Sequence, residues 1–177
     1  MSLKRTGKVA LCGVMAALST VIMLLSYFPY LTYAVPAVAG LLFVILSIEV
    51  GHKWSFMSYA ATAVLVLLLA EQEAKIMFIA FFGYYPILKG LIESLRRRVI
   101  EYIIKFLLFN IVMAGVYALF IFVFGMPLDQ MGNFGKWTLL VIFGMGNVAF
   151  FLYDFTITQL IGLYMQSFHA KLQKLIH

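Results

Sequence analysis

The feature that most constrains this chain is a series of long apolar segments separated by short charged stretches. Each segment is close to the roughly 20 apolar residues that a helix needs to cross a bilayer. Lipid cannot satisfy free backbone polar groups, so such segments must be helical. Six can be placed, at residues 9–28, 32–50, 54–70, 75–95, 100–124 and 137–165. The sequence therefore predicts an all-α, polytopic integral membrane bundle with six transmembrane helices.

Composition supports the same class of protein. Of the 177 residues, 64% are hydrophobic and 11% are charged, against roughly 25% charged in an average soluble domain. No repeat or linker divides the chain, so we expect one transmembrane domain over residues 1–177. The first apolar run is longer than that of a signal peptide, and only a poor cleavage site follows it around Thr32 and Ala34. We therefore expect it to be retained as a helix.

The formal net charge of +6 comes from basic residues that lie between the apolar segments. They indicate membrane topology, and no nucleic-acid partner is expected. If the N-terminus is cytoplasmic, only Lys75 and Lys136 of the 13 Lys and Arg residues fall on the outer side. The positive-inside rule then predicts both termini inside a bacterial-type plasma membrane. The basic residues of the inner segments are Lys4, Arg5, Lys8, Lys53, Lys89, Arg96, Arg97, Arg98, Lys105, Lys171 and Lys174.

Two segments are expected to depart from a straight span. Pro86 predicts a kink in the fourth. The last segment, at residues 137–165, would be roughly 43 Å long as one helix, more than the ~30 Å hydrocarbon core. It must tilt, project into the cytoplasm, or break near Gly144 and Gly146. The GxGxxA pattern at residues 144–149 follows no strand, so it favours close packing or a kink over dinucleotide binding.

Chemical motifs are sparse. The sequence contains no paired catalytic residues, nucleotide-binding loop or metal-binding motif, and its three histidines are scattered. We therefore expect a protein that is not an enzyme and that has neither a cofactor nor a metal.

Polar residues within or beside the apolar segments are the candidate ligand contacts. Asp154 is the only acidic residue deep in such a run, where it is expected to bind substrate, pair with a cation or cap a helix. Asn147 shares its face if the last helix is continuous. Glu71 and Glu73 form either a solvated turn or the rim of an outer pocket. The predicted substrate-binding residues are Glu71, Glu73, Tyr84, Asn110, Tyr117, Asn147 and Asp154.

Small residues repeat at four-residue spacing in the first apolar segment. They form two pairs, Cys12 with Ala16 and Gly13 with Ala17. Such spacing lets another helix approach closely. The stripe predicts either packing inside the bundle or docking to a different membrane subunit.

Two short stretches resemble a known family. Residues 8–19, around the small-residue stripe, resemble the opening of substrate-binding S components of energy-coupling factor transporters. Residues 154–162 and the basic ending at 171–176 are similar to the last helix and tail of that family. The resemblance implies six helices and a first-helix motif, here Cys12, Gly13, Ala16 and Ala17, that docks on a transmembrane coupling subunit.

The resemblance also implies a function. The chain is expected to capture a small, vitamin-like nutrient in an outward-opening cavity. It would then deliver the nutrient when joined to a transmembrane coupling subunit and two ATPase subunits. The alternative is a non-transport membrane scaffold, such as an MreD-like cell-shape protein. An intramembrane enzyme ranks below both, because no catalytic pair is present.

Overall fold

The computed structural model describes residues 5–124 and 138–167. The predicted outer loop at residues 125–136 lies outside the described residues, as do Lys4, Lys136, Lys171 and Lys174. Within the described ranges the chain is helical, without strands, and this confirms the predicted all-α class. In chain order the elements are α1 (Arg5–Leu24), the 3-10 turn η1 (Leu25–Tyr27), α2 (Ala34–Val50), α3 (His52–Leu69), α4 (Gln72–Met77), the π-helical segment η2 (Phe78–Phe82), α5 (Tyr85–Glu93), α6 (Arg98–Phe124) and α7 (Thr138–Ser167).

Helix length and hydropathy indicate a membrane protein. Five helical stretches of the described residues are long and apolar enough to cross a bilayer. The remaining predicted segment, at residues 32–50, forms α2, which is apolar but has only 17 residues. Large hydrophobic side chains are exposed along the helices, as expected where lipid is the solvent. The five long stretches are Arg5–Tyr27, His52–Leu69, Gln72–Glu93, Arg98–Leu119 and Leu140–Gln166.

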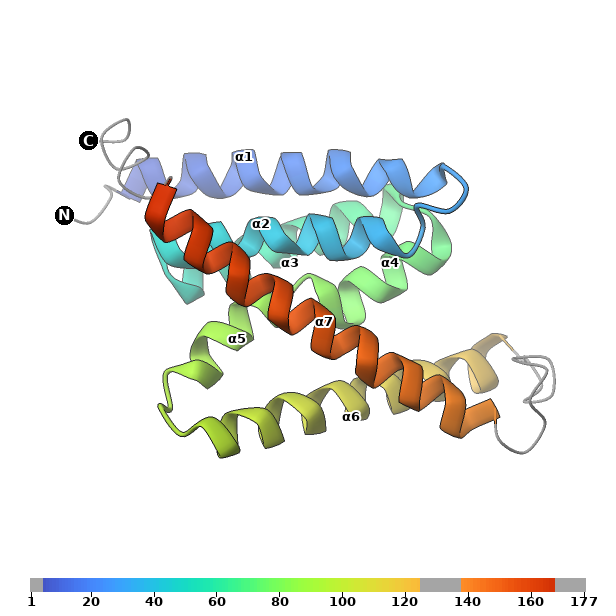
Figure 1. Cartoon of the computed structure of the whole chain (residues 1–177). Helices are drawn as coiled ribbons and strands as arrows, with labels where there is room; N and C mark the ends of the chain where they lie inside the picture. Colours follow the sequence, from blue (N-terminus) through green and yellow to red (C-terminus); the bar gives the residue numbers. More distant parts are fainter. Residues whose placement is uncertain (1–4, 125–137, 168–177) are drawn as a thin grey trace.

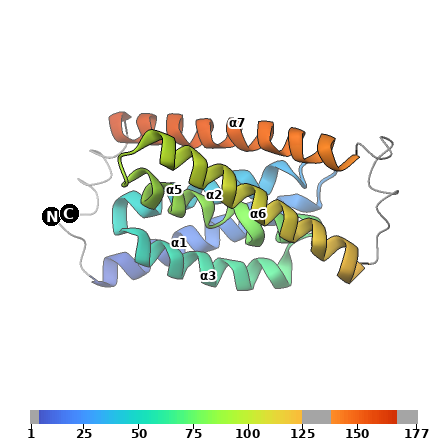
Figure 2. The same cartoon turned by 90° about the horizontal axis from the view of Figure 1, so that it is seen from below.

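Helices α1, α2 and α3 form a packed layer, and α6 and α7 form a pair whose axes diverge (Figures 1 and 2). α1 packs against α2 and α3, while α7 crosses α2 and meets α6. The beginning of α1 and the end of α7 lie at one end of the bundle, together with the α2–α3 and α5–α6 turns (Figure 1). We call this the basic end, because it carries Lys53 and Arg96, Arg97 and Arg98. The α3–α4 turn lies at the opposite end.

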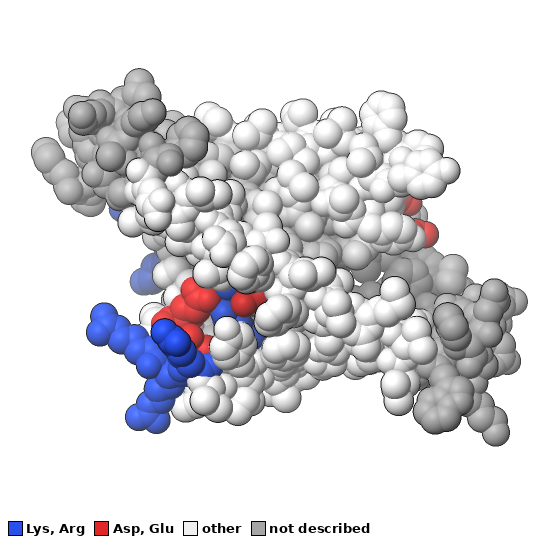
Figure 3. Space-filling view, viewed as in Figure 1, with Lys and Arg blue, Asp and Glu red and all other residues white. Residues whose placement is uncertain are grey.

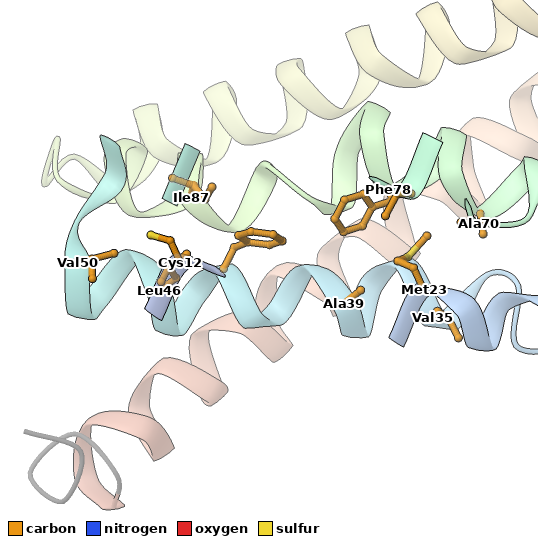
Figure 4. Packing of buried hydrophobic residues seen from close by; sticks show 12 residues of the cluster. Cys12, Met23, Val35, Ala39, Leu46, Val50, Ala70, Phe78 and Ile87 are labelled. Carbon is orange, nitrogen blue, oxygen red and sulfur yellow. The ribbon is translucent and has the colours of Figure 1, made fainter. Parts of the chain in front are cut away.

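The main core lies between α1, α2, α3 and the π-helical segment (Figure 4). Phe43 of α2 and Phe78 of η2 are both fully buried, with ring centroids 6.2 Å apart. α2 can approach this closely because residue 40 is glycine. A Cβ at Gly40 would lie 2.1 Å from the carbonyl oxygen of Phe82. The glycine therefore fixes the packing of α2 on η2.

The fourth predicted span is interrupted, whereas the last one is not. α4 widens into the π-helical segment η2, and Pro86 lies in the first turn of α5. Proline is tolerated there because the first helical N–H groups have no partner within the helix. The sequence predicted a kink at Pro86, and the structure shows that one helix ends and another begins just before this residue. α7 runs without a break through Gly144 and Gly146, which excludes the alternative of a broken last segment.

Candidate functional site

An apolar cleft separates the π-helical segment from α6 and α7. Its inner part is a cavity of about 260 Å³, and its outer part is an adjoining cavity of about 530 Å³. The two share Ala80, Val112 and Val116. On α6 the cleft extends from Leu119 to Phe109, which is about 15 Å along a helix. Small-molecule sites measure roughly 300–1,000 Å³. The outer cavity falls within that range, and the inner one lies just below it.

Aromatic rings form the inner end of the cleft. Phe109 and Phe150 stack with their ring centroids 4.6 Å apart, and Phe81 meets Phe150 edge-on. Phe81 also stacks on Tyr85, again at 4.6 Å between centroids. Tyr85 does not line the cleft, but it is fully buried directly beneath a residue that does. The rings thus separate an apolar space from the polar groups that Tyr85 contacts.

Beneath the aromatic layer lies a cluster of charged side chains. The Tyr85 hydroxyl donates a hydrogen bond of 2.6 Å to Asp154 Oδ1. The same carboxylate accepts hydrogen bonds from Lys89 Nζ and, at 3.3 Å, from Lys105 Nζ. Asp154 comes from α7, Lys89 from α5 and Lys105 from α6. One carboxylate therefore joins three helices.

A second carboxylate completes this cluster. Glu93 Oε1 lies 3.0 Å from Lys89 Nζ and 2.7 Å from Lys105 Nζ. The Lys89 side chain is fully buried, whereas 35% of the Glu93 side chain is exposed. Two ammonium groups and two carboxylates leave the cluster without net formal charge. Figure 3 shows acidic and basic side chains gathered where α5 joins α6, at the basic end.

Neutralisation makes the buried charges tolerable. A buried ion loses its hydration, so removal of one partner from such a pair is costly, whereas the complete pair is roughly neutral in free energy. Among the described side chains, no buried nitrogen or oxygen lacks a hydrogen-bond partner. The geometry therefore assigns Asp154 to one of its predicted roles, pairing with a cation. It does not bring Asp154 to the surface of the cleft.

The predicted residues Asn110 and Asn147 do meet. Their amides exchange two hydrogen bonds, of 3.0 and 3.1 Å, between α6 and α7. Each amide also donates to the carbonyl four residues earlier in its own helix, at 2.8 Å. The pair therefore joins the two helices beside the cleft, and neither side chain lines it.

The acidic residues at the α3–α4 turn are engaged locally. Glu71 caps α4, and its carboxylate accepts the backbone N–H groups of Glu73 and Ala74. Glu73 accepts a 2.7 Å hydrogen bond from the Tyr33 hydroxyl. This hydrogen bond, with the negative charge of Glu73, raises the pKa of Tyr33 above its ordinary value. Both carboxylates lie at the opposite end of the bundle, outside the lining of the cleft.

The two predicted tyrosines are placed differently. Tyr84 precedes α5 and packs edge-on against Tyr59 and Phe81. Tyr117 is half-buried on α6. Neither lines the cleft. Its wall is formed mostly by apolar residues that were not among the predicted substrate-binding residues.

Three charged residues of the cluster were not predicted from the sequence as site residues. Lys89 and Lys105, which the charge asymmetry assigns to topology, are buried in α5 and α6. Glu93 follows Lys89 at the four-residue spacing of a helical ion pair. In the sequence, Asp154 has no basic residue nearby in its own apolar segment. Together with the Lys89–Glu93 spacing, this could have indicated that the two segments share a charge cluster.

The small-residue stripe on α1 is divided between two faces. Cys12 and Ala16 are buried, and the backbone carbonyl of Cys12 accepts a 2.9 Å hydrogen bond from Ser58 of α3. Gly13 and Ala17 are exposed, and a Cβ at Gly13 would meet nothing within 4 Å. One pair therefore serves internal packing, and the other leaves a shallow exposed face.

Fold and site together define the class: an all-helical membrane protein with an apolar cleft above a neutralised charge cluster. Among the described residues, no group of three or more His, Cys, Asp or Glu could hold a metal ion. Comparison of the chain with protein-family models, curated proteins and solved structures gave no match.

Proposed function

We propose that this chain is a membrane-embedded capture subunit that takes up a small, vitamin-like nutrient. The observation that carries the proposal is the apolar cleft between η2, α6 and α7. A ligand pocket is typically concave and mostly apolar, with few polar groups. The cleft fits that description, because Gln72 and Lys75 are the only polar residues among the described residues that line it.

The orientation is part of the proposal. We place both termini inside a bacterial-type cell membrane, with six crossings and with the cleft opening at the outer end. Exposed Lys53 and Arg96, Arg97 and Arg98 at the basic end support this direction under the positive-inside rule. Lys89 and Lys105 are buried in the cluster, so they no longer count as topology signals. The excess of exposed basic residues at the basic end persists without them.

Cysteine labelling in intact cells measures the orientation. Cys12 is first replaced by serine, and single cysteines are then introduced as Gln72→Cys and Arg97→Cys, both at exposed positions. A membrane-impermeant maleimide is expected to label position 72 only. Labelling of position 97 from outside would reverse the orientation.

Delivery across the membrane would depend on partners. By its resemblance to energy-coupling factor S components, the chain would join a transmembrane coupling subunit and two ATPases. The exposed Gly13 and Ala17 face of α1 suits close approach by a partner helix.

The arrangement of the rings suggests how occupancy could be communicated. Phe81 lines the cleft and stacks on Tyr85, which in turn hydrogen-bonds Asp154. A ligand that moves Phe81 would therefore alter the packing around the charges that join α5, α6 and α7. In this proposal the cluster transmits a change in the cleft to the basic end.

Native mass spectrometry of the full-length protein, purified from membranes, tests the capture function. We expect a small molecule to co-purify with the wild-type chain. Ala80→Trp should remove it, because Ala80 lines both parts of the cleft. Ala61→Trp, at an exposed alanine of α3, is the matched control and should retain it.

The scaffold alternative predicts a different result. It is favoured by one observation: none of the seven predicted substrate-binding residues lines the cleft. If the protein carries no small molecule but holds other membrane proteins in stable complexes, the capture function is wrong. A bound molecule that Ala80→Trp does not affect would also contradict this use of the cleft.

A further inference from the structure

A basic side chain stands at the outer mouth of the cleft. Lys75 of α4 lines the outer cavity together with Gln72, Leu67 of α3 and Leu119 of α6. Among the described residues that line either cavity, it is the one lysine or arginine. It lies at the opposite end of the bundle from the exposed arginines of the α5–α6 turn. Topology therefore does not explain why a cation is placed here.

Lys75 has a weak protein partner. Its ammonium donates a hydrogen bond to the Leu67 carbonyl at 3.4 Å, which is long for this kind of bond. None of the four ion pairs of the described residues includes it. The two nearby carboxylates are directed elsewhere, since Glu71 caps α4 and Glu73 accepts from Tyr33. Lys75 is therefore a cation available to an incoming anion.

The far end of the cleft has the opposite chemistry. The described residues that line the inner cavity are all apolar or glycine, and the aromatic ones are Phe81, Phe82, Phe109 and Phe150. A molecule that fills both cavities therefore meets a positive charge at one end and aromatic rings at the other.

We infer that the cleft takes a small amphipathic anion, with a carboxylate or phosphate at Lys75 and an apolar or aromatic body against Phe109 and Phe150. This inference rests on the proposed function and names the class of its substrate. The occupant is a water-borne molecule and not a bilayer phospholipid. A diacyl lipid would have to leave one of its chains outside an inner cavity of about 260 Å³.

The test uses the full-length chain in phosphatidylcholine nanodiscs. The probe is 1-pyrenebutyrate, and its neutral counterpart is 1-pyrenebutanol. Equilibrium dialysis against protein-free discs corrects for partition into lipid. We expect saturable binding of the acid at one site per chain. Lys75→Met should weaken it roughly 10- to 100-fold, the value of a charge-assisted hydrogen bond, and leave binding of the alcohol unchanged.

Two controls isolate the charge. Lys75→Arg should retain binding of the acid, since it keeps the positive charge. Lys53→Met removes an exposed cation at the basic end and should also have no effect. An effect of Lys53→Met as large as that of Lys75→Met would overturn the inference, because it would reflect general surface charge.

The remaining outcomes distinguish the inference from the function on which it rests. If Lys75→Met binds the acid as well as the wild type while Ala80→Trp abolishes binding, the cleft remains a ligand site but the anion inference is wrong. If Ala80→Trp binds both probes normally, use of the cleft for capture is itself wrong. If phosphatidylglycerol in the discs displaces the acid, the occupant is a lipid headgroup and the inference fails. Absence of saturable binding of the acid also overturns it.

Discussion

Asp154 carries the densest set of polar contacts among the described residues of α7. Its carboxylate accepts from Tyr85, Lys89 and Lys105, and its backbone carbonyl accepts from Lys89 at 3.0 Å. A carboxylate in a membrane helix is expensive without such partners. The residue is therefore held by the balance of charge around it, and changes in that balance should be measurable as stability.

Removal of one charge from the cluster should cost more than removal of a matched pair. Lys89→Met leaves one lysine facing two carboxylates, and Asp154→Asn leaves two lysines facing one. Each single change should destabilise the protein by about 3–5 kcal/mol. The double variant keeps the Lys105–Glu93 pair and should lose less than the sum of the two. Thermal denaturation of the purified protein in detergent gives the comparison.

The control for this cycle is Lys53→Met, at an exposed position on α3. It removes a charge without disturbing a buried partner, so its melting temperature should match that of the wild type. Strictly additive losses in the double variant would contradict the cluster, because they would show that Lys89 and Asp154 do not interact.

At the scale of elements, α1 has two faces with different roles. Ala16 is 8% exposed and faces the bundle, whereas its neighbour Ala17 is exposed. Ala16→Leu should overpack the buried face of α1 and cost about 1–3 kcal/mol. Ala17→Leu should change stability by no more than about 0.5 kcal/mol. Thermal denaturation of the two variants, which add the same side chain one residue apart, measures the difference.

The same pair of variants tests docking. If the outward face of α1 meets a coupling subunit, Ala17→Leu should retain ligand while assembly with partners and uptake decrease. If Ala17→Leu destabilises the protein, both pairs of small residues on α1 serve internal packing. Normal assembly and uptake in that variant would remove the face from the docking surface.

Element boundaries were largely predictable because apolar length and Pro86 are local properties of the chain. The six predicted segments correspond to α1, α2, α3, the α4–η2–α5 stretch, α6 and α7. The wall of the cleft was not predictable. Phe109 and Phe150 look like any other apolar residue of a span, and only the divergence of α6 and α7 from η2 leaves a space beside them.

The charge cluster was predictable in part. An acidic residue in an apolar segment indicates that a polar or basic partner lies nearby, and pairing with a cation was one expected role of Asp154. The identity of the partner depends on helix order and rotation, which place Lys89 and Lys105 on the same carboxylate. The basic residues near span ends resembled topology signals because charge alone does not distinguish a buried lysine from an exposed one.

At the scale of the whole molecule, the two ends of the bundle carry charged residues, and the part between them is apolar. The basic end carries exposed arginines and the charge cluster, while the opposite end carries Lys75 and the capped α3–α4 turn. Between them lies the apolar cleft, separated from the cluster by the rings of Phe81 and Tyr85. The central claim is that this cleft, and not the predicted polar residues, holds the captured molecule.

An experimental structure of the full-length protein, purified from membranes and reconstituted in nanodiscs, tests that claim most directly. We predict density for a small molecule in the cleft, with its apolar part against Phe109 and Phe150 and its polar end near Lys75. A cleft closed by α6 packed onto η2, or filled by an acyl chain continuous with the surrounding lipid, would contradict it.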